Sequence, residues 1–176
     1  MTITEETEGQ LHSVLVEAAA ELLEGLGMSA EPARADEDDL AAVIGFTSEH
    51  LCGNLLLRAQ ESFVERTRSQ LMGGRASTHA ERCDWVAELS NQLLGRIKNK
   101  LISRGVSIAM TTPSVIEGRN ISISRPPSTE KHLRFHLETG TGPLWAWLDL
   151  EVQPTLALLA TNAVDDVVSE GDVLMF

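Results

Sequence analysis

Hydrophobic and polar residues follow two different periods along the chain. A helical pattern of Ala, Leu and Glu runs from Leu11 to Leu26, and similar patterns over 61–72 and 81–103 end at Gly73 and Gly105. Apolar runs of strand length cover 40–46, 53–59, 106–110, 133–137 and 144–152. Residues 1–9 are polar and are expected to be frayed. The pattern of the last 23 residues, 154–176, does not decide between helix and strand.

This order of elements predicts an α+β fold, with an antiparallel sheet and long helices packed on it. Residues 16–23 also align weakly with residues 87–94, and in both halves a helix precedes a strand–turn–strand pair. Gly53 and Gly142 each open the second strand of such a pair. We therefore expect two pseudo-repeated halves in a single domain over residues 10–176, with 154–176 left unassigned.

Charge and composition exclude several classes of protein. The formal net charge is −12 and the chain has no Lys/Arg-rich run, which argues against binding to nucleic acid or to an anionic membrane surface. No apolar stretch reaches the roughly 20 residues of a membrane span, and the acidic start MTITEETEGQ is unlike a secretory signal. Cys52 and Cys83 lie in no metal or redox motif, so two buried, reduced thiols and a cytoplasmic location are expected.

The segment 84–101 combines an apolar face with a polar one. Its helical spacing places five residues on the face expected to pack on the sheet: Val86, Leu89, Leu93, Ile97 and Leu101. Glu88, Asn91 and Gly95 fall together on the opposite side. A glycine inside a helix costs about 1 kcal/mol relative to alanine, and close approach by another protein would offset this cost. An ordinary solvated helix face explains the same residues, so both interpretations stay open here.

Two further pairs of residues are candidates for sites. His132 and His136 are four residues apart, but Leu133, Phe135 and Leu137 alternate with them, which favours a strand with an outward polar face over a zinc site. Trp145 and Trp147 alternate with apolar residues, so both faces of that strand are apolar. Burial within the chain and a dimer contact both account for the two tryptophans. No phosphate-binding loop or cofactor fingerprint is present.

Two motifs carry a resemblance to a known family. Asp84 precedes Glu88-Leu89, Asn91 and Gly95, and the segment Pro113-Ser-Val115-Ile116-Glu-Gly118 follows at a distance. With these motifs, over roughly residues 10–152, the chain resembles the CheC/CheX/FliY family of chemotaxis phosphatases. The first helix carries Ala20 where the later helix carries Asn91, and a single site makes CheX the best match. Arg96 and residues 154–176 depart from the family pattern.

The resemblance implies a phosphatase that hydrolyses the aspartyl-phosphate of a CheY-like response regulator. In this interpretation Glu88 docks to the regulator's lysine and Asn91 orients the attacking water. The partner-binding surface is expected to comprise Glu88, Asn91, Gly95 and Lys98. The chain would need no metal site or cofactor of its own, because the regulator supplies Mg²⁺, and it would form a homodimer. The alternative is a non-catalytic adaptor that binds a receiver domain, or a polarity or motor protein, through the same helix.

Overall fold

A computed structural model of the chain describes residues 4–26, 39–71, 73–118, 121, 132–138, 144–153, 155–156 and 158–159. For residues 71 and 132–138 it describes the backbone alone. The helices and strands follow in the order α1 (Glu5–Gly25), β1 (Asp39–Thr47), β2 (Leu51–Gln60), α2 (Glu61–Leu71), α3 (His79–Ile102), β3 (Ala109–Met110), β4 (Ser114–Gly118), β5 (His132–Glu138) and β6 (Leu144–Val152).

The strands form one antiparallel sheet in the order β3-β1-β2-β6-β5. β4 pairs with the same edge of β1 as β3 does, but over Asp39–Val43, whereas β3 pairs with Phe46 and Thr47. Alternate residues of each strand point to one face, and there the central strands bury Leu40, Ala42, Ile44, Leu55, Leu57, Leu144, Ala146, Leu148 and Leu150. The predicted α+β class, with an antiparallel sheet, is confirmed.

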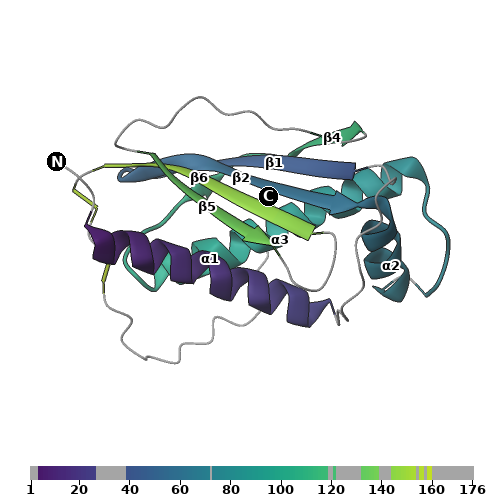
Figure 1. Ribbon diagram of the computed structural model, residues 1–176, viewed down its shortest axis with the longest axis horizontal. Helices are drawn as coiled ribbons and strands as arrows, with labels where there is room; N and C mark the ends of the chain where they lie inside the picture. The colour runs from purple at the N-terminus through teal and green to yellow at the C-terminus, as the bar shows by residue number, and fades with distance from the viewer. Residues whose placement is uncertain are drawn as a thin grey trace, which may run out of the picture.

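Helices α1 and α3 lie side by side beneath this apolar face, and α2 stands at one end of the sheet (Figure 1). Leu11, Val14, Leu15, Ala18 and Leu22 of α1 join the same core. Lys100 of α3 clamps the two long helices together, because its Nζ lies 3.3 Å from Glu17 Oε2 and 2.6 Å from Glu21 Oε1 on α1. The long helix α3 therefore packs against α1 on one side and against the sheet above it.

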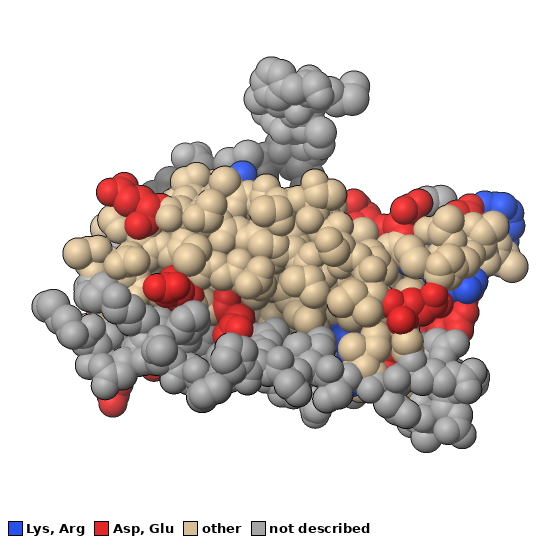
Figure 2. Space-filling model, turned by 90° about the horizontal axis from the view of Figure 1, so that it is seen from above, with Lys and Arg blue, Asp and Glu red and all other residues tan. Residues whose placement is uncertain are grey.

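Trp145 and Trp147 are half-buried on the opposite face of the sheet, here called the helix-free face because none of the described helices packs on it. The guanidinium of Arg58 on β2 sits 4.6 Å from the ring centre of Trp145. Figure 2 shows this face from above, with mostly uncharged side chains across its middle. Among the described helices, none covers the tryptophans.

The helix boundaries differ from the expectation mainly at the N-terminus. α1 begins at Glu5 rather than at Leu11, so the expected fraying over residues 1–9 is wrong from Glu5 onward. The Thr4 side chain accepts a hydrogen bond from Thr7 N–H and caps the helix. The negative charges of Glu5, Glu6 and Glu8 also interact favourably with the positive N-terminal end of the helix dipole. The polar composition of this segment thus reflects a capped helix start.

The strands on the outer edge also differ from the expectation. β3 covers only Ala109–Met110 of the expected 106–110, although Val106 and Ile108 just before it are buried. β4 was not expected to be a strand. Gly142, which is expected to open the second strand of its pair, and most of 154–176 lie outside the described residues. The pseudo-repeat stays a prediction.

The two cysteines are not both buried as expected. Cys52 is exposed and Cys83 is half-buried, and neither is in a disulfide. Cys52 pairs with Thr47 and Glu151 on the helix-free face, since strand alternation turns it away from the helices. Within the described ranges, no helix has the length and apolar character that crossing a membrane requires.

Candidate functional site

The start of α3 is fixed by a capping box. Thr78 accepts a hydrogen bond from Glu81 N–H, and the Glu81 carboxylate accepts one from Thr78 N–H at 2.7 Å. The main-chain N–H and the hydroxyl of Thr78 both donate to this carboxylate and, aided by the charges of Arg68 and Arg75, lower the pKa of Glu81 to about 2. Glu81 therefore stays ionised at neutral pH and sets where the helix begins, two turns before Glu88.

The inner face of α3 packs as the periodicity predicts. All five expected residues, Val86, Leu89, Leu93, Ile97 and Leu101, are buried. Trp85 is buried as well, and its indole N–H donates to Thr67 Oγ1 of α2 at 2.8 Å. Since these contacts fix the rotation of α3 about its axis, they decide which residues face solvent.

The outer face of α3 carries every residue predicted for the site. Asp84 and Glu88 are exposed, while Asn91, Gly95 and Lys98 are half-exposed. Residues three or four apart on a helix are surface neighbours, about 5–6 Å between Cβ atoms, so these side chains form one continuous ridge. The helix thus brings the carboxylate of Glu88 and the amide of Asn91 onto one open surface.

The carboxylate of Glu88 is oriented by a neighbour that the sequence analysis missed. Gln92 Nε2 donates to Glu88 Oε1 at 2.9 Å, which leaves Oε2 open. Arg96 in turn donates from Nη1 to the main-chain oxygen of Gln92 at 3.3 Å. In the sequence, only the i,i+4 spacing of Gln92 from Glu88 indicates this contact, because an amide and a carboxylate at that spacing can meet on a helix.

Asn91 and Lys98 keep their polar groups free of other described residues. The Asn91 amide forms no hydrogen bond, and the Lys98 ammonium no ion pair, within the part of the chain that the structure describes. The carboxylates of Asp84 and Glu88 likewise have no cationic partner there. A ridge of unpaired donors and acceptors is suited to contact with another molecule.

Gly95 leaves a gap in this ridge that no packing contact requires. An added Cβ at Gly95 would meet no heavy atom within 4 Å. The glycine is therefore not needed to fit α3 against its own neighbours, and its cost to the helix, about 1 kcal/mol, has no compensation in the described residues.

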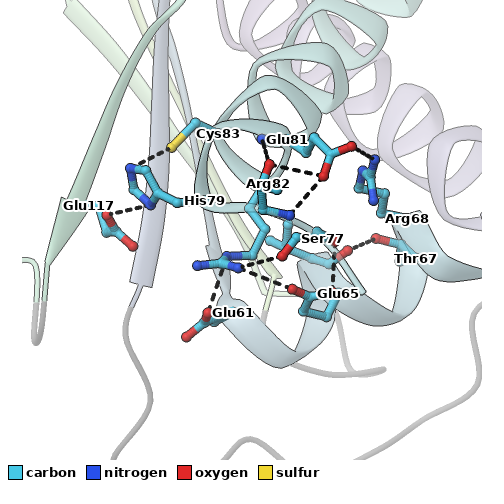
Figure 3. A network of polar contacts seen from close by, with 12 residues as sticks. Glu61, Glu65, Thr67, Arg68, Ser77, His79, Glu81, Arg82, Cys83 and Glu117 are labelled. Atoms are coloured by element: carbon cyan, nitrogen blue, oxygen red, sulfur yellow. Dashed lines mark hydrogen bonds and ion pairs between the residues drawn. The ribbon is translucent and has the colours of Figure 1, made fainter. Parts of the chain in front are cut away.

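A polar network braces the end of α3 that carries Glu88 (Figure 3). Arg82 bridges from α3 to Glu61 at 3.1 Å and to Glu65 at 3.3 Å, both on α2. His79 Nδ1 lies 3.2 Å from Glu117 Oε2 and links the first turn of α3 to β4. These contacts tie the first turns of α3 to both α2 and β4.

The part of α1 that aligns with the ridge of α3 does not carry the same free polar groups. Ala20, which aligns with Asn91, is exposed but offers no polar group, and Glu17 is engaged by Lys100. Nowhere in the described ranges do three or more His, Cys, Asp or Glu side chains form a group that could hold a metal ion. The structure therefore brings the predicted site residues together on α3 alone.

Comparison with known proteins identifies the fold. A CheX from Vibrio vulnificus is 18% identical with a TM-score of 0.64, over 80% of this chain and 96% of that one. A CheX from Desulfovibrio desulfuricans is 21% identical with a TM-score of 0.63, over 80% and 99%. The CheX–CheY–BeF3–Mg²⁺ complex from Borrelia burgdorferi is 17% identical with a TM-score of 0.55, over 80% and 96%. No curated protein matches the chain.

The family itself is given by a sequence profile. The profile described as "Chemotaxis phosphatase CheX" matches residues 40–137, which is more than half of the chain and includes the whole of α3. The matched region therefore contains the ridge with Glu88 and Asn91, together with β2, β3, β4 and nearly all of β1 and β5, but not β6. The chain belongs to the CheX family of chemotaxis phosphatases.

Proposed function

We propose that this chain hydrolyses the aspartyl-phosphate of a CheY-like response regulator by inserting the outer ridge of α3 into the regulator's active site. The observation that carries the proposal is the pairing of an exposed Glu88 carboxylate with an Asn91 amide on one face of one rigid helix. Membership of the CheX family supports the reaction class, and the Borrelia burgdorferi relative was solved in complex with CheY.

Glu88 is the proposed docking residue. Its carboxylate is exposed and has no cationic partner among the described residues, and Gln92 holds one of its oxygens in place. The open oxygen can then accept a charge-assisted hydrogen bond from the regulator's lysine. Partial pre-orientation lowers the side-chain entropy lost when the ion pair forms.

Asn91 is the proposed catalytic residue. Its amide is half-exposed and has no hydrogen-bond partner in the described chain, so both its oxygen and its nitrogen can engage groups in the regulator. Phosphoryl transfer depends on positioning and charge stabilisation, and an amide that orients a water in line with the phosphorus meets the first need. The described residues offer no metal cluster, and we propose that the regulator supplies the Mg²⁺.

The adaptor alternative uses the same ridge without catalysis. It differs in one measurable quantity, because an adaptor would bind the regulator and leave the lifetime of its phosphate unchanged. Addition of the chain to a phosphorylated receiver domain, with inorganic phosphate release followed over time, separates the two. Faster release supports hydrolysis, and binding without faster release would support the adaptor.

A substitution at Gly95 tests whether the receiver domain approaches α3 closely at this position. We expect Gly95→Ala to stabilise the free protein by about 0.5–1 kcal/mol, because alanine favours the helix and the site is open. The same methyl should weaken binding to the receiver by about fivefold or more, since overpacking costs about 1–3 kcal/mol. Urea denaturation and titration calorimetry measure the two effects.

Gly9 on α1 supplies the matched control, because it is exposed and an added Cβ there also meets nothing within 4 Å. Gly9→Ala should stabilise the helix to a similar extent and leave receiver affinity unchanged. Wild-type affinity for Gly95→Ala would show that no partner approaches α3 closely at this point.

We further propose that the chain is a homodimer that pairs through the helix-free face of the sheet. Trp145 and Trp147 offer half-buried aromatic surface there, and a C₂ pairing would bury the same patch on both copies. Light scattering coupled to size exclusion at micromolar concentration should give about twice the chain mass of 19.1 kDa. A mass near that of one chain would refute the dimer.

A further inference from the structure

A recess opens beside Glu88, between α2 and the first half of α3. Its volume is about 380 Å³, and it is lined by Arg68, Glu81, Asp84, Trp85 and Glu88. Glu88 stands at its edge, so a partner that reached Glu88 would also cover the recess. The sequence could not indicate it, because Arg68 belongs to α2 and the other four residues to α3.

The carboxylates of the recess differ in how they are neutralised. Glu81 pairs with Arg68 at 2.8 Å and also with Arg75. Asp84 and Glu88, which are one helical turn apart, form no ion pair with any described residue. Like charges at this spacing destabilise a helix, and a cation placed between them would relieve the repulsion.

The buried wall of the recess carries an unsatisfied hydrogen-bond donor. The Arg68 side chain is only 9% exposed, and its Nη2 is used by Glu81. Its Nη1 is buried and has no hydrogen-bond partner in the described part of the chain. A buried donor without an acceptor is unfavourable. A ligand that places an acceptor next to Arg68 Nη1 would therefore form a hydrogen bond that the described residues do not provide.

Trp85 gives the recess an apolar wall of fixed orientation. Its indole N–H is held by Thr67, so the ring cannot turn freely. An indole ring suits the alkyl stem of lysine or arginine and attracts the charged head group. The recess therefore suits a long basic side chain, because its carboxylates can pair with the charged head group and its aromatic wall can contact the alkyl stem.

We infer that this recess binds a lysine or arginine side chain on the surface of the receiver domain, with Asp84 as its anionic partner. The inference rests on the proposed function and adds a second cation, distinct from the active-site lysine assigned to Glu88. The alkyl stem packs along Trp85, and a main-chain oxygen of the same receiver segment accepts from Arg68 Nη1. Asp84 then selects among receiver domains by the presence of that basic residue.

Asp84→Asn tests this inference, because it keeps the shape of the side chain and removes its charge. Asp84 is exposed, so we expect the variant to fold. At low salt its dissociation constant for the phosphorylated receiver should rise about three- to tenfold, and the difference should shrink at high salt. The rate at saturating receiver should change by less than twofold. Asp84→Glu should restore most of the affinity.

The control is Glu24→Gln, which removes one exposed carboxylate from α1 and should leave the affinity unchanged. Wild-type affinity of Asp84→Asn at low salt would overturn the inference, and so would a loss of affinity in Glu24→Gln as large as that in Asp84→Asn. Failure of the proposed function looks different, because the wild-type protein itself would then leave the lifetime of the receiver's phosphate unchanged, whatever the affinity of Asp84→Asn.

Discussion

Asn91→Ala should lower the turnover of receiver phosphate by about 10²-fold or more while leaving receiver affinity within about twofold. The amide has no hydrogen-bond partner among the described residues and is half-exposed, so its removal creates no unsatisfied group within the protein. Its proposed contribution is to aim the water, an interaction gained mainly in the transition state, and its loss therefore reduces the rate more than the binding.

Glu88→Ala provides the contrast. It should weaken binding as well as turnover, because the proposed ion pair with the regulator's lysine contributes to docking, although an exposed pair adds only about 1 kcal/mol. Single-turnover phosphate release gives the rate, and titration of a receiver held in a phosphate-like state gives the affinity. Full activity of Asn91→Ala against the true partner would contradict the mechanism.

Gly53→Ala should destabilise the protein by about 3 kcal/mol, at the upper end of the usual cost of overpacking. Gly53 lies in β2 opposite Leu150 of β6 and Phe46 of β1. An added Cβ would overlap the main-chain oxygen of Asp149 and lie 3.1 Å from Phe46 Cζ. A backbone oxygen cannot move aside as a side chain can, so β6 would have to shift at the centre of the sheet.

Urea denaturation of Gly53→Ala against the wild type measures this effect, and loss of a cooperative transition is the same result in stronger form. Gly45→Ala is the control from the neighbouring strand, because the three atoms nearest to an added Cβ there are side-chain atoms of Thr111 and Asn54 at 3.3–3.5 Å and not a main-chain oxygen. We expect Gly45→Ala to cost less than about 1 kcal/mol. Wild-type stability for Gly53→Ala would contradict the close approach of β2 and β6.

The central parts of the fold were predictable because their patterns are local and repetitive. The apolar spacing of α3 identified its buried face from Val86 to Leu101, and alternation identified β6 from Leu144 to Val152. The start of α1 was missed because the mostly polar composition of residues 1–9 outweighed a single capping hydroxyl, that of Thr4. β4 was missed because it is a short segment between Pro113 and Gly118 with no clear strand pattern of its own. It is extended because it pairs with the edge of β1.

The site was predictable only in part, for a similar reason. Helical periodicity brought Glu88, Asn91 and Gly95 together without any tertiary information, and Lys98 follows on the same ridge. The role of Gln92 depends on a side-chain rotamer, and the recess depends on how α2 docks against α3. Neither a side-chain rotamer nor a contact between two helices produces a periodic pattern in the sequence.

The proposed phosphatase activity is tested most directly by the lifetime of the aspartyl-phosphate on the partner receiver domain. The receiver is phosphorylated, excess phosphodonor is removed, and phosphate release is followed with and without a substoichiometric amount of this protein. The account predicts that the protein shortens the lifetime through many turnovers and that Asn91→Ala does not. An unchanged lifetime in the presence of bound wild-type protein would contradict it.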